Sequence, residues 1–135
     1  SNELSNICDS VTGRPILFCS GMVLYDSMGN IIDNGNYLVD SLYYNFPFWI
    51  EPTTRVTQGS LILPKGNNQY YVFTAGMSDF AFDQWQGPNA TIDSFRFDVL
   101  SYHVVDMDSN NGKGKVVQKN VVLVVLRRAH KIFAS

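Results

Sequence analysis

Charged side chains are scarce in this chain of 135 residues: they make up 16% of the sequence, whereas 45% of the residues are hydrophobic. Charge this sparse fits an all-β extracellular protein better than a charged, helical cytosolic one. The formal net charge at pH 7 is −2. The charge balance therefore gives no electrostatic reason to expect nucleic acid as a partner.

Long apolar runs are missing as well. No stretch approaches the ~20 apolar residues that a membrane-spanning helix needs, and no segment has a convincing amphipathic helical period. We therefore expect no membrane span. A chain of this length suits one domain with its own core, so we predict a single all-β domain over residues 1–135.

Cysteine occurs only twice, at Cys8 and Cys19. Two thiols are too few to form a zinc site unaided. If residues 9–15 form a turn, the two cysteines lie on neighbouring strands, where a disulfide needs Cα atoms within about 7 Å of each other. The sequence leaves open a bridge or two buried thiols.

The chain does contain short apolar segments separated by Gly, Pro, Asn and Asp, a pattern typical of β-strands joined by turns. The centre of this pattern is a hairpin whose strands flank a turn over residues 64–68. About eight strands are expected in all: Asn6–Cys8, Ile16–Ser20, Met22–Tyr25, Asn30–Ile32, Ser60–Leu63, Gln69–Ala75, Ser94–Met107 and Lys115–Leu126.

Successive antiparallel strands predict either two propeller-like blades, about residues 5–35 and 58–126, or a compact β-sandwich or barrel. The strands of the central hairpin do not alternate cleanly between apolar and polar residues, so both faces are expected to meet protein. Exposed faces or edges would favour association, most simply as a symmetric homodimer. The side chains expected in the core are Leu61, Leu63, Val72, Phe73, Val104 and Val105.

Four segments carry a resemblance to a known family: NICDSVTGRPILFCSG, MVLYDSMGNIIDNG, TQGSLILPKGNNQYYVFTA and LSYHVVDMDSNNGKGKVVQKNVVL. Together they resemble the N-terminal propeller-like region of large secreted or surface proteins of Bacteroidota, which often carry type IX secretion sorting domains. The resemblance implies blades like those of WD40 or kelch folds, an extracellular or cell-surface location and membership of a larger chain. It carries no catalytic motif to transfer.

Aromatic side chains gather in two long segments, 37–56 and 76–93, that we expect to be loops. Loop aromatics can stack on sugar rings or anchor a protein partner. They can equally form a satellite core that holds a long loop down. The candidate ligand-binding residues are Tyr43, Tyr44, Trp49 and Trp85.

One loop has the spacing of a metal site. Asp106, Asp108 and Asn110 occupy the first, third and fifth positions of a calcium loop, but the glycine comes one place late and no glutamate ends the loop. A polar turn is the simpler interpretation, because Asn and Gly tolerate positive φ. We therefore expect no metal and no cofactor, and keep this loop as a weak calcium candidate.

Catalytic signals are weak. Ser101 and Asp106 lie close to His103 in sequence, but no GxSxG elbow is present, so a strand histidine that is packed or solvated is expected. The leading hypothesis is a non-enzymatic extracellular binding or structural module. The alternative is a carbohydrate-active hydrolase or glycan-binding domain, which would use loop aromatics and paired carboxylates. The carboxylates available for such a role include Glu51, Asp79, Asp83 and Asp93.

Overall fold

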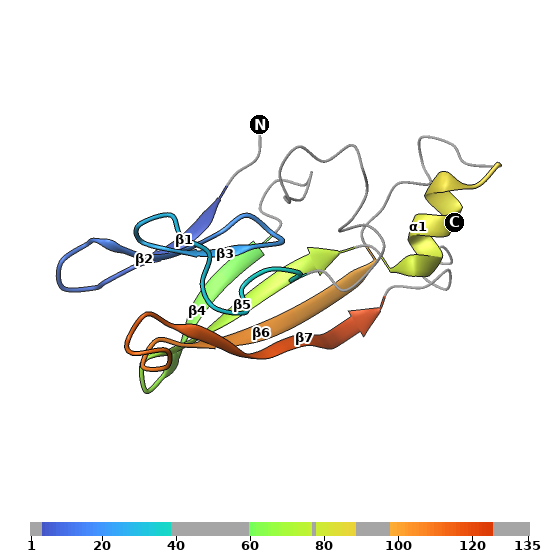
Figure 1. The fold of residues 1–135 in the computed structure, drawn as a ribbon. Coiled ribbons are helices and arrows are strands. Elements are labelled where there is room, and N and C mark those ends of the chain that lie inside the picture. The colour runs from blue at the N-terminus through green and yellow to red at the C-terminus, as the bar shows by residue number, and fades with distance from the viewer. Residues whose placement is uncertain (1–3, 39–59, 77, 89–97, 126–135) are drawn as a thin grey trace.

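The computed structural model describes residues 4–38, 60–76, 78–88 and 98–125. Within these ranges the chain forms seven strands in two antiparallel sheets and one short helix (Figure 1). The all-β antiparallel expectation is confirmed, with seven strands where about eight were expected. The strands are β1 (Ser5–Cys8), β2 (Pro15–Cys19), β3 (Leu24–Asp26), β4 (Ser60–Gly66), β5 (Gln69–Gly76), β6 (Val99–Asp106) and β7 (Lys115–Val125), and the helix is α1 (Asp79–Gln86).

The smaller sheet has the order β1-β2-β3. Asp9 shapes the turn after β1, because its Oδ1 accepts hydrogen bonds from the backbone N–H groups of Val11 and Thr12 at 2.8 and 2.9 Å. The second expected hairpin is shorter than predicted. Its returning segment, residues 30–32, pairs with β3 only through a single bridge between Tyr25 and Ile31.

The larger sheet has the order β4-β5-β6-β7, so each strand pairs with the next one along the chain. The central hairpin turns at Asn67 and Asn68, whose φ angles are 55° and 60°. Two successive left-handed residues define the type I′ turn that joins twisted strands most closely. The hairpin is therefore present, but β4 runs three residues further than predicted, to Gly66.

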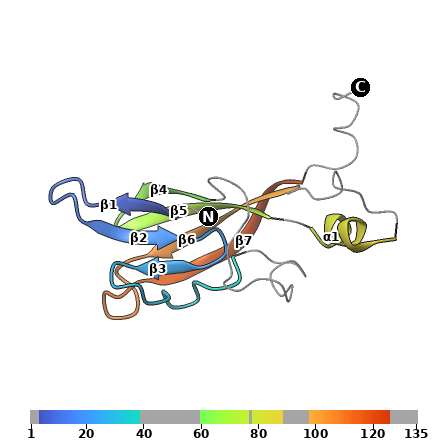
Figure 2. The ribbon, with the colours of Figure 1, turned by 90° about the horizontal axis from the view of Figure 1, so that it is seen from above.

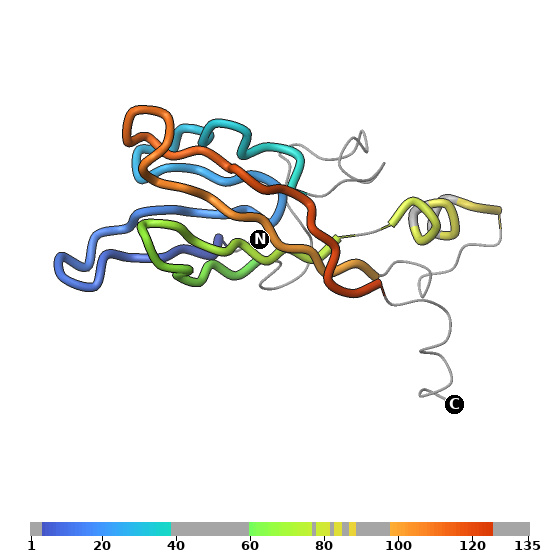
Figure 3. The backbone as a smooth tube through the Cα atoms, turned by 90° about the horizontal axis from the view of Figure 1, so that it is seen from below, coloured from blue at the N-terminus to red at the C-terminus, as the bar shows by residue number. Residues whose placement is uncertain are grey.

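The two sheets form two layers, with β1–β3 lying across one face of the larger sheet (Figure 2). Viewed from the other side, the larger sheet is in front, and α1 lies beyond one end of both sheets (Figure 3). One hydrophobic cluster takes side chains from both layers: Leu17, Cys19, Leu24, Ile32, Leu38, Ile62, Val72, Val105 and Val116. Of the architectures considered, this arrangement is a β-sandwich, and no closed propeller or barrel is formed by the described residues.

Residues 33–38 form a strap that connects the smaller sheet to the far edge of the larger one. At one end the Val116 N–H donates to the Asp33 carbonyl at 2.9 Å. At the other end the Leu38 N–H donates to the Met22 carbonyl at 2.9 Å. The strap therefore covers the edge of β7 along the first half of that strand.

The core prediction was half right. Val72 and Val105 are fully buried and Val104 nearly so, which confirms three of the six expected core residues. Leu61 and Leu63, however, are 42% and 43% exposed, so their placement in the core was wrong. They point away from the smaller sheet, and strand alternation sends neighbouring residues to opposite faces. Phe73 shares their face and is half-buried.

The structure contains one short helix, α1, where the sequence shows no convincing amphipathic helical period. The Ser78 Oγ accepts a hydrogen bond from the Ala81 N–H at 3.2 Å and so caps α1, and Asp79 places an acidic group in the first turn. Asp98 holds this cap, because its carboxylate accepts from the Ser78 N–H and hydroxyl at 2.7 and 2.6 Å. A helix of eight residues is too short for its apolar period to be detected in the sequence.

Among the described residues no helix has the length and apolar character to cross a membrane.

Candidate binding face on the larger sheet

The strongest candidate site is the face of the larger sheet that points away from β1–β3. We call it the outer face and define it by six side chains that share one side of β4, β5 and β6: Leu61, Leu63, Tyr71, Phe73, Leu100 and Tyr102. The register places them together, because Leu61 lies opposite Phe73, which lies opposite Tyr102. Directly opposed residues of antiparallel strands project from the same side of the sheet. The outer face is thus a contiguous apolar surface.

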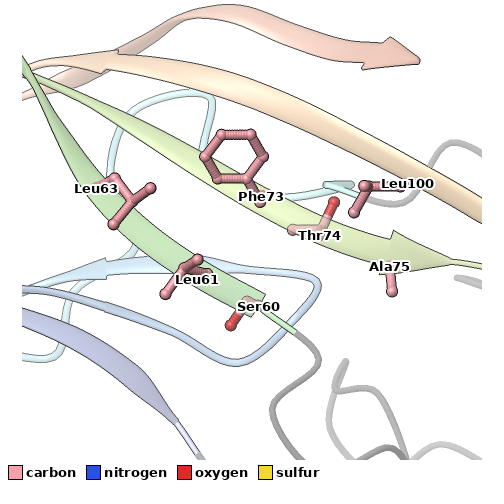
Figure 4. A pocket seen from close by; sticks show the side chains of 7 residues that line it. All are labelled: Ser60, Leu61, Leu63, Phe73, Thr74, Ala75 and Leu100. Carbon is pink, nitrogen blue, oxygen red and sulfur yellow. The ribbon is translucent and has the colours of Figure 1, made fainter. Parts of the chain in front are cut away.

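An open depression lies within the outer face, with a volume of about 400 Å³. Figure 4 shows leucines from β4 and β6 around Phe73 of β5. The residues that line it are Ser60, Leu61, Leu63, Phe73, Thr74, Ala75 and Leu100. The lining offers large apolar contact and few polar groups, which suits an apolar partner rather than a charged one.

The aromatic rings of the outer face pack against one another at an angle. Tyr71 meets Tyr102 edge to face, with centroids 5.8 Å apart and planes at 81°. Phe73 is tilted by 38° to Tyr71 and by 49° to Tyr102. Such tilted arrangements are the preferred geometry of aromatic pairs. The three rings therefore present mixed edges and faces to a partner, rather than one flat platform for stacking a sugar.

The opposite, inner face carries a buried polar network centred on His103. The ring is fully buried, and its Nε2 lies 2.8 Å from the Thr74 Oγ1, which in turn donates to the Leu38 carbonyl at 3.0 Å. The His103 Nδ1 accepts a hydrogen bond from the Asn120 N–H at 2.9 Å. With Nδ1 an acceptor, Nε2 carries the proton and donates to Thr74. Both ring nitrogens are therefore occupied in the neutral ring.

Burial lowers the pKa of His103 from 6.5 to about 4, with a further contribution from the positive charge of Lys119. The imidazole is neutral at neutral pH. Because both nitrogens already have partners, the ring is not placed to act as a general base for Ser101. Asp106, the third residue of the hypothetical triad, instead accepts hydrogen bonds within its own turn. Of the two expectations for a strand histidine, packed or solvated, the structure shows the packed one.

The strap of residues 33–38 forms hydrogen bonds with the part of β7 that contacts this network. Asn120 interrupts β7 with φ 57°, and its Nδ2 donates to the Tyr37 carbonyl at 3.0 Å. Lys119 Nζ donates to the Asn34 Oδ1 at 3.1 Å. Tyr37 itself has φ 55°, an uncommon conformation for an aromatic residue. These contacts hold the two layers together at the β7 edge.

The weak calcium candidate forms a compact polar turn. Asp106 accepts from the Asp108 N–H at 3.0 Å and from the Ser109 hydroxyl at 3.1 Å. Asp108 Oδ1 accepts from Asn68 Nδ2 at 2.8 Å, and Asn110 has φ 56°. Within the ranges described, no group of three or more His, Cys, Asp or Glu residues could hold a metal ion. The turn geometry explains this sequence without a metal.

Most of the aromatic candidates fall outside the described residues: Tyr43, Tyr44 and Trp49 belong to residues 39–59. Trp85 is in α1, which lies beyond one end of the sheets (Figure 1). Of the candidate carboxylates, Asp79 and Asp83 are exposed one turn apart on α1, while Glu51 and Asp93 lie outside the described residues. The structure therefore does not gather the predicted ligand-binding residues into one described site.

The two cysteines are free: Cys8 is exposed and Cys19 is buried. They are not cross-strand partners, because Cys8 pairs with Pro15 and Cys19 with Ser5. Burial raises the pKa of the Cys19 thiol. Its sulfur accepts from the Gly21 N–H at 3.4 Å, so it acts as a packed core side chain.

Sequence reasoning missed the outer face because several polar side chains of the larger sheet point inward while large apolar ones point outward. Thr74, Ser101 and His103 face the inside, while leucines on the neighbouring strands face outward. The one available signal was parity, since Leu61 and Leu63 share a side of β4 that Ile62 does not. Searches with this chain found no matching family model, no matching curated protein and no matching solved structure.

Proposed function

We propose that this chain is a non-enzymatic binding or structural module that holds another protein surface against its outer face. The observation that carries the proposal is the exposure of large apolar side chains there. Leu61, Leu63 and Leu100 are each at least 40% exposed and surround one aromatic group. Contiguous apolar surface of this kind on a sheet face is typical of an interaction site.

The partner we propose is a second copy of this chain, packed face to face. Two sheets stack about 10 Å apart when their apolar side chains interdigitate, as in a β-sandwich. Three strands spaced about 4.8 Å, with roughly five residues each, cover on the order of 200 Å². A standard interface uses about 800 Å² per partner, so this face alone supports only a weak dimer.

The C-terminal half of β7 extends the apolar surface. Val122, Leu123 and Val124 are each about half exposed, and no charged residue occurs from Val121 to Val125. This segment lies beyond Asn120, so it is past the stretch of β7 edge that the strap covers. Val124 lies opposite Leu100 and so adds to the outer face, whereas Val122 lies opposite Ser101 on the other side of the sheet.

A protein partner is favoured over a glycan. Sugar-binding platforms rely on aromatic faces that lie flat against the pyranose ring, whereas the rings here are tilted against one another by 38° to 81°. Few polar groups line the depression to bind sugar hydroxyls. The extracellular or cell-surface location, and membership of a larger protein, rest on the low charge content and on the resemblance to Bacteroidota surface proteins.

Site-specific crosslinking tests the proposal. A benzophenone amino acid replaces Leu63 on the outer face, and in a matched control it replaces Val11, which is 91% exposed in the β1–β2 turn. We expect a crosslinked dimer from position 63 and none from position 11. Equal crosslinking from both positions, or none from position 63, would contradict face-to-face pairing.

A further inference from the structure

The chain contains two Asn-Gly steps, Asn34-Gly35 and Asn111-Gly112. The two steps differ in the hydrogen bonds that hold them in the fold. An asparagine followed by glycine is the sequence most prone to deamidation, because the glycine lacks a side chain to obstruct attack by its backbone nitrogen. The reaction requires the asparagine side chain and the following peptide N–H to move freely. Their hydrogen bonds in the fold therefore decide which step reacts.

The Asn34-Gly35 step is clamped. Asn34 Nδ2 donates to the Val116 carbonyl at 3.0 Å, and its Oδ1 accepts from Lys119 Nζ at 3.1 Å. The Gly35 N–H donates to the Ile32 carbonyl at 2.7 Å. Gly35 is also buried so closely that an added Cβ would lie 2.8 Å from that same carbonyl oxygen. The attacking nitrogen and the side-chain amide are both held.

The Asn111-Gly112 step is open. It lies at the exposed tip of the β6–β7 connection, with φ 56° at Asn111 and 81° at Gly112. The bonds that hold this turn run between its neighbours, from the Lys113 N–H to the Asn110 carbonyl and from the Gly114 N–H to the Ser109 carbonyl. Within the described ranges, neither the Asn111 amide nor the Gly112 N–H has a hydrogen-bond partner. Nothing lies within 4 Å of a Cβ built on Gly112.

We infer that Asn111 is a deamidation site of the folded protein, whereas Asn34 is protected by the strap. The Gly112 nitrogen attacks Asn111 Cγ, a C–N bond forms, the Cγ–Nδ2 bond breaks and ammonia leaves with the proton. Water then opens the resulting succinimide at either carbonyl to give aspartate or isoaspartate. The product adds a negative charge to a turn that already holds Asp106 and Asp108, and isoaspartate also lengthens the backbone by one methylene.

Peptide mapping by mass spectrometry, after incubation of the folded chain at mildly alkaline pH, tests the inference. We expect conversion at Asn111 to exceed that at Asn34 by about tenfold or more, because reaction at the clamped step requires local opening. In urea the two steps should convert at comparable rates, which separates the effect of the fold from that of local sequence. The variant Asn111→Gln should remove the faster conversion and leave the slower one unchanged.

Two results would overturn the inference. The first is equal conversion of the two steps in the folded chain. The second is the absence of conversion at Asn111 in the folded chain over a period in which the urea-unfolded chain converts both steps. Neither result depends on whether the chain forms a dimer, because Asn111 is not part of the outer face.

Discussion

The Asn120 N–H donates to the His103 Nδ1 at 2.9 Å, and this bond joins the irregular point of β7 to the centre of the inner face. The positive φ of Asn120 marks the irregularity, since β7 places two residues, Lys119 and Asn120, opposite the single residue His103. A β-bulge of this kind redirects a backbone N–H that would otherwise join the ladder. Here the redirected group satisfies a buried imidazole, so the bulge and the histidine support each other.

Replacing His103 tests this relationship. His103→Leu keeps the apolar bulk but leaves the Asn120 N–H without an acceptor, while the Thr74 hydroxyl keeps its bond to the Leu38 carbonyl. We expect a loss of about 1–3 kcal/mol in the free energy of unfolding, which is the cost of one buried donor left unsatisfied. Urea unfolding measures this loss. Val117→Ala on the exposed side of β7 is the control, and a His103→Leu loss no larger than the control's would refute the role of the network.

The same histidine predicts a dependence of stability on pH. Its pKa in the folded state is about 4, below the ordinary value of 6.5, so folding favours the neutral ring. The stabilisation is fully present above pH 6.5 and is lost as the pH falls from there toward 4. The shift corresponds to an upper bound of about 3 kcal/mol.

Unfolding midpoints in urea, measured between pH 7 and pH 4, check this dependence. The wild-type chain should lose stability across that window, and His103→Leu should lose much less. Asp9, whose pKa is lowered by backbone hydrogen bonds, does not confuse the comparison, because it is present in both chains. Parallel pH profiles for the two chains would show that the histidine is not the responsible group.

The conformation of Asn120 gives a separate prediction. At φ 57° a residue with a Cβ is strained, whereas glycine is not. Asn120→Ala and Asn120→Gly both lose the bond from Nδ2 to the Tyr37 carbonyl. We therefore expect the glycine variant to be more stable than the alanine variant by about 1 kcal/mol. Thermal unfolding compares them, and an alanine variant equal to or better than the glycine variant would rule out the left-handed conformation.

Strand β5 tests which face is the inner one. Val72 is fully buried, while its neighbour Phe73 is half-buried on the outer face. Val72→Ala should cost about 2–3 kcal/mol through the cavity it leaves, and Phe73→Ala only about 1–2 kcal/mol through partial loss of apolar burial. Both are measured at low protein concentration so that association does not contribute. A loss of 4 kcal/mol or more for Phe73→Ala would place that ring in the core instead.

The strands were predictable from sequence because turn residues mark their ends. Asn67 and Asn68 carry the positive φ angles that their residue types favour, and the strands on either side follow from them. Helix α1 was not predictable, because its cap depends on Asp98, which is 20 residues away from Ser78. A contact between distant residues leaves no periodic signal in the local sequence.

The candidate site was harder to predict than the fold. The leucines of β4 appeared to be core residues because hydrophobicity alone does not say which face of a sheet is covered. That depends on where β1–β3 pack, which is a tertiary contact. The sequence predicted His103 only as a packed or solvated strand residue. Its network includes Leu38, Thr74 and Asn120, which come from three separate segments.

Light scattering during size-exclusion chromatography tests the central claim, that the outer face binds a second copy. The wild-type chain is compared across a concentration series with Leu63→Lys, which places a charge on the outer face, and with Val11→Lys, which places one in the distant β1–β2 turn. The proposal predicts that wild type and Val11→Lys shift from monomer toward dimer mass as concentration rises through tens of micromolar, while Leu63→Lys remains monomeric. A wild-type chain that keeps monomer mass throughout, or a dimer that Leu63→Lys leaves intact, would contradict it.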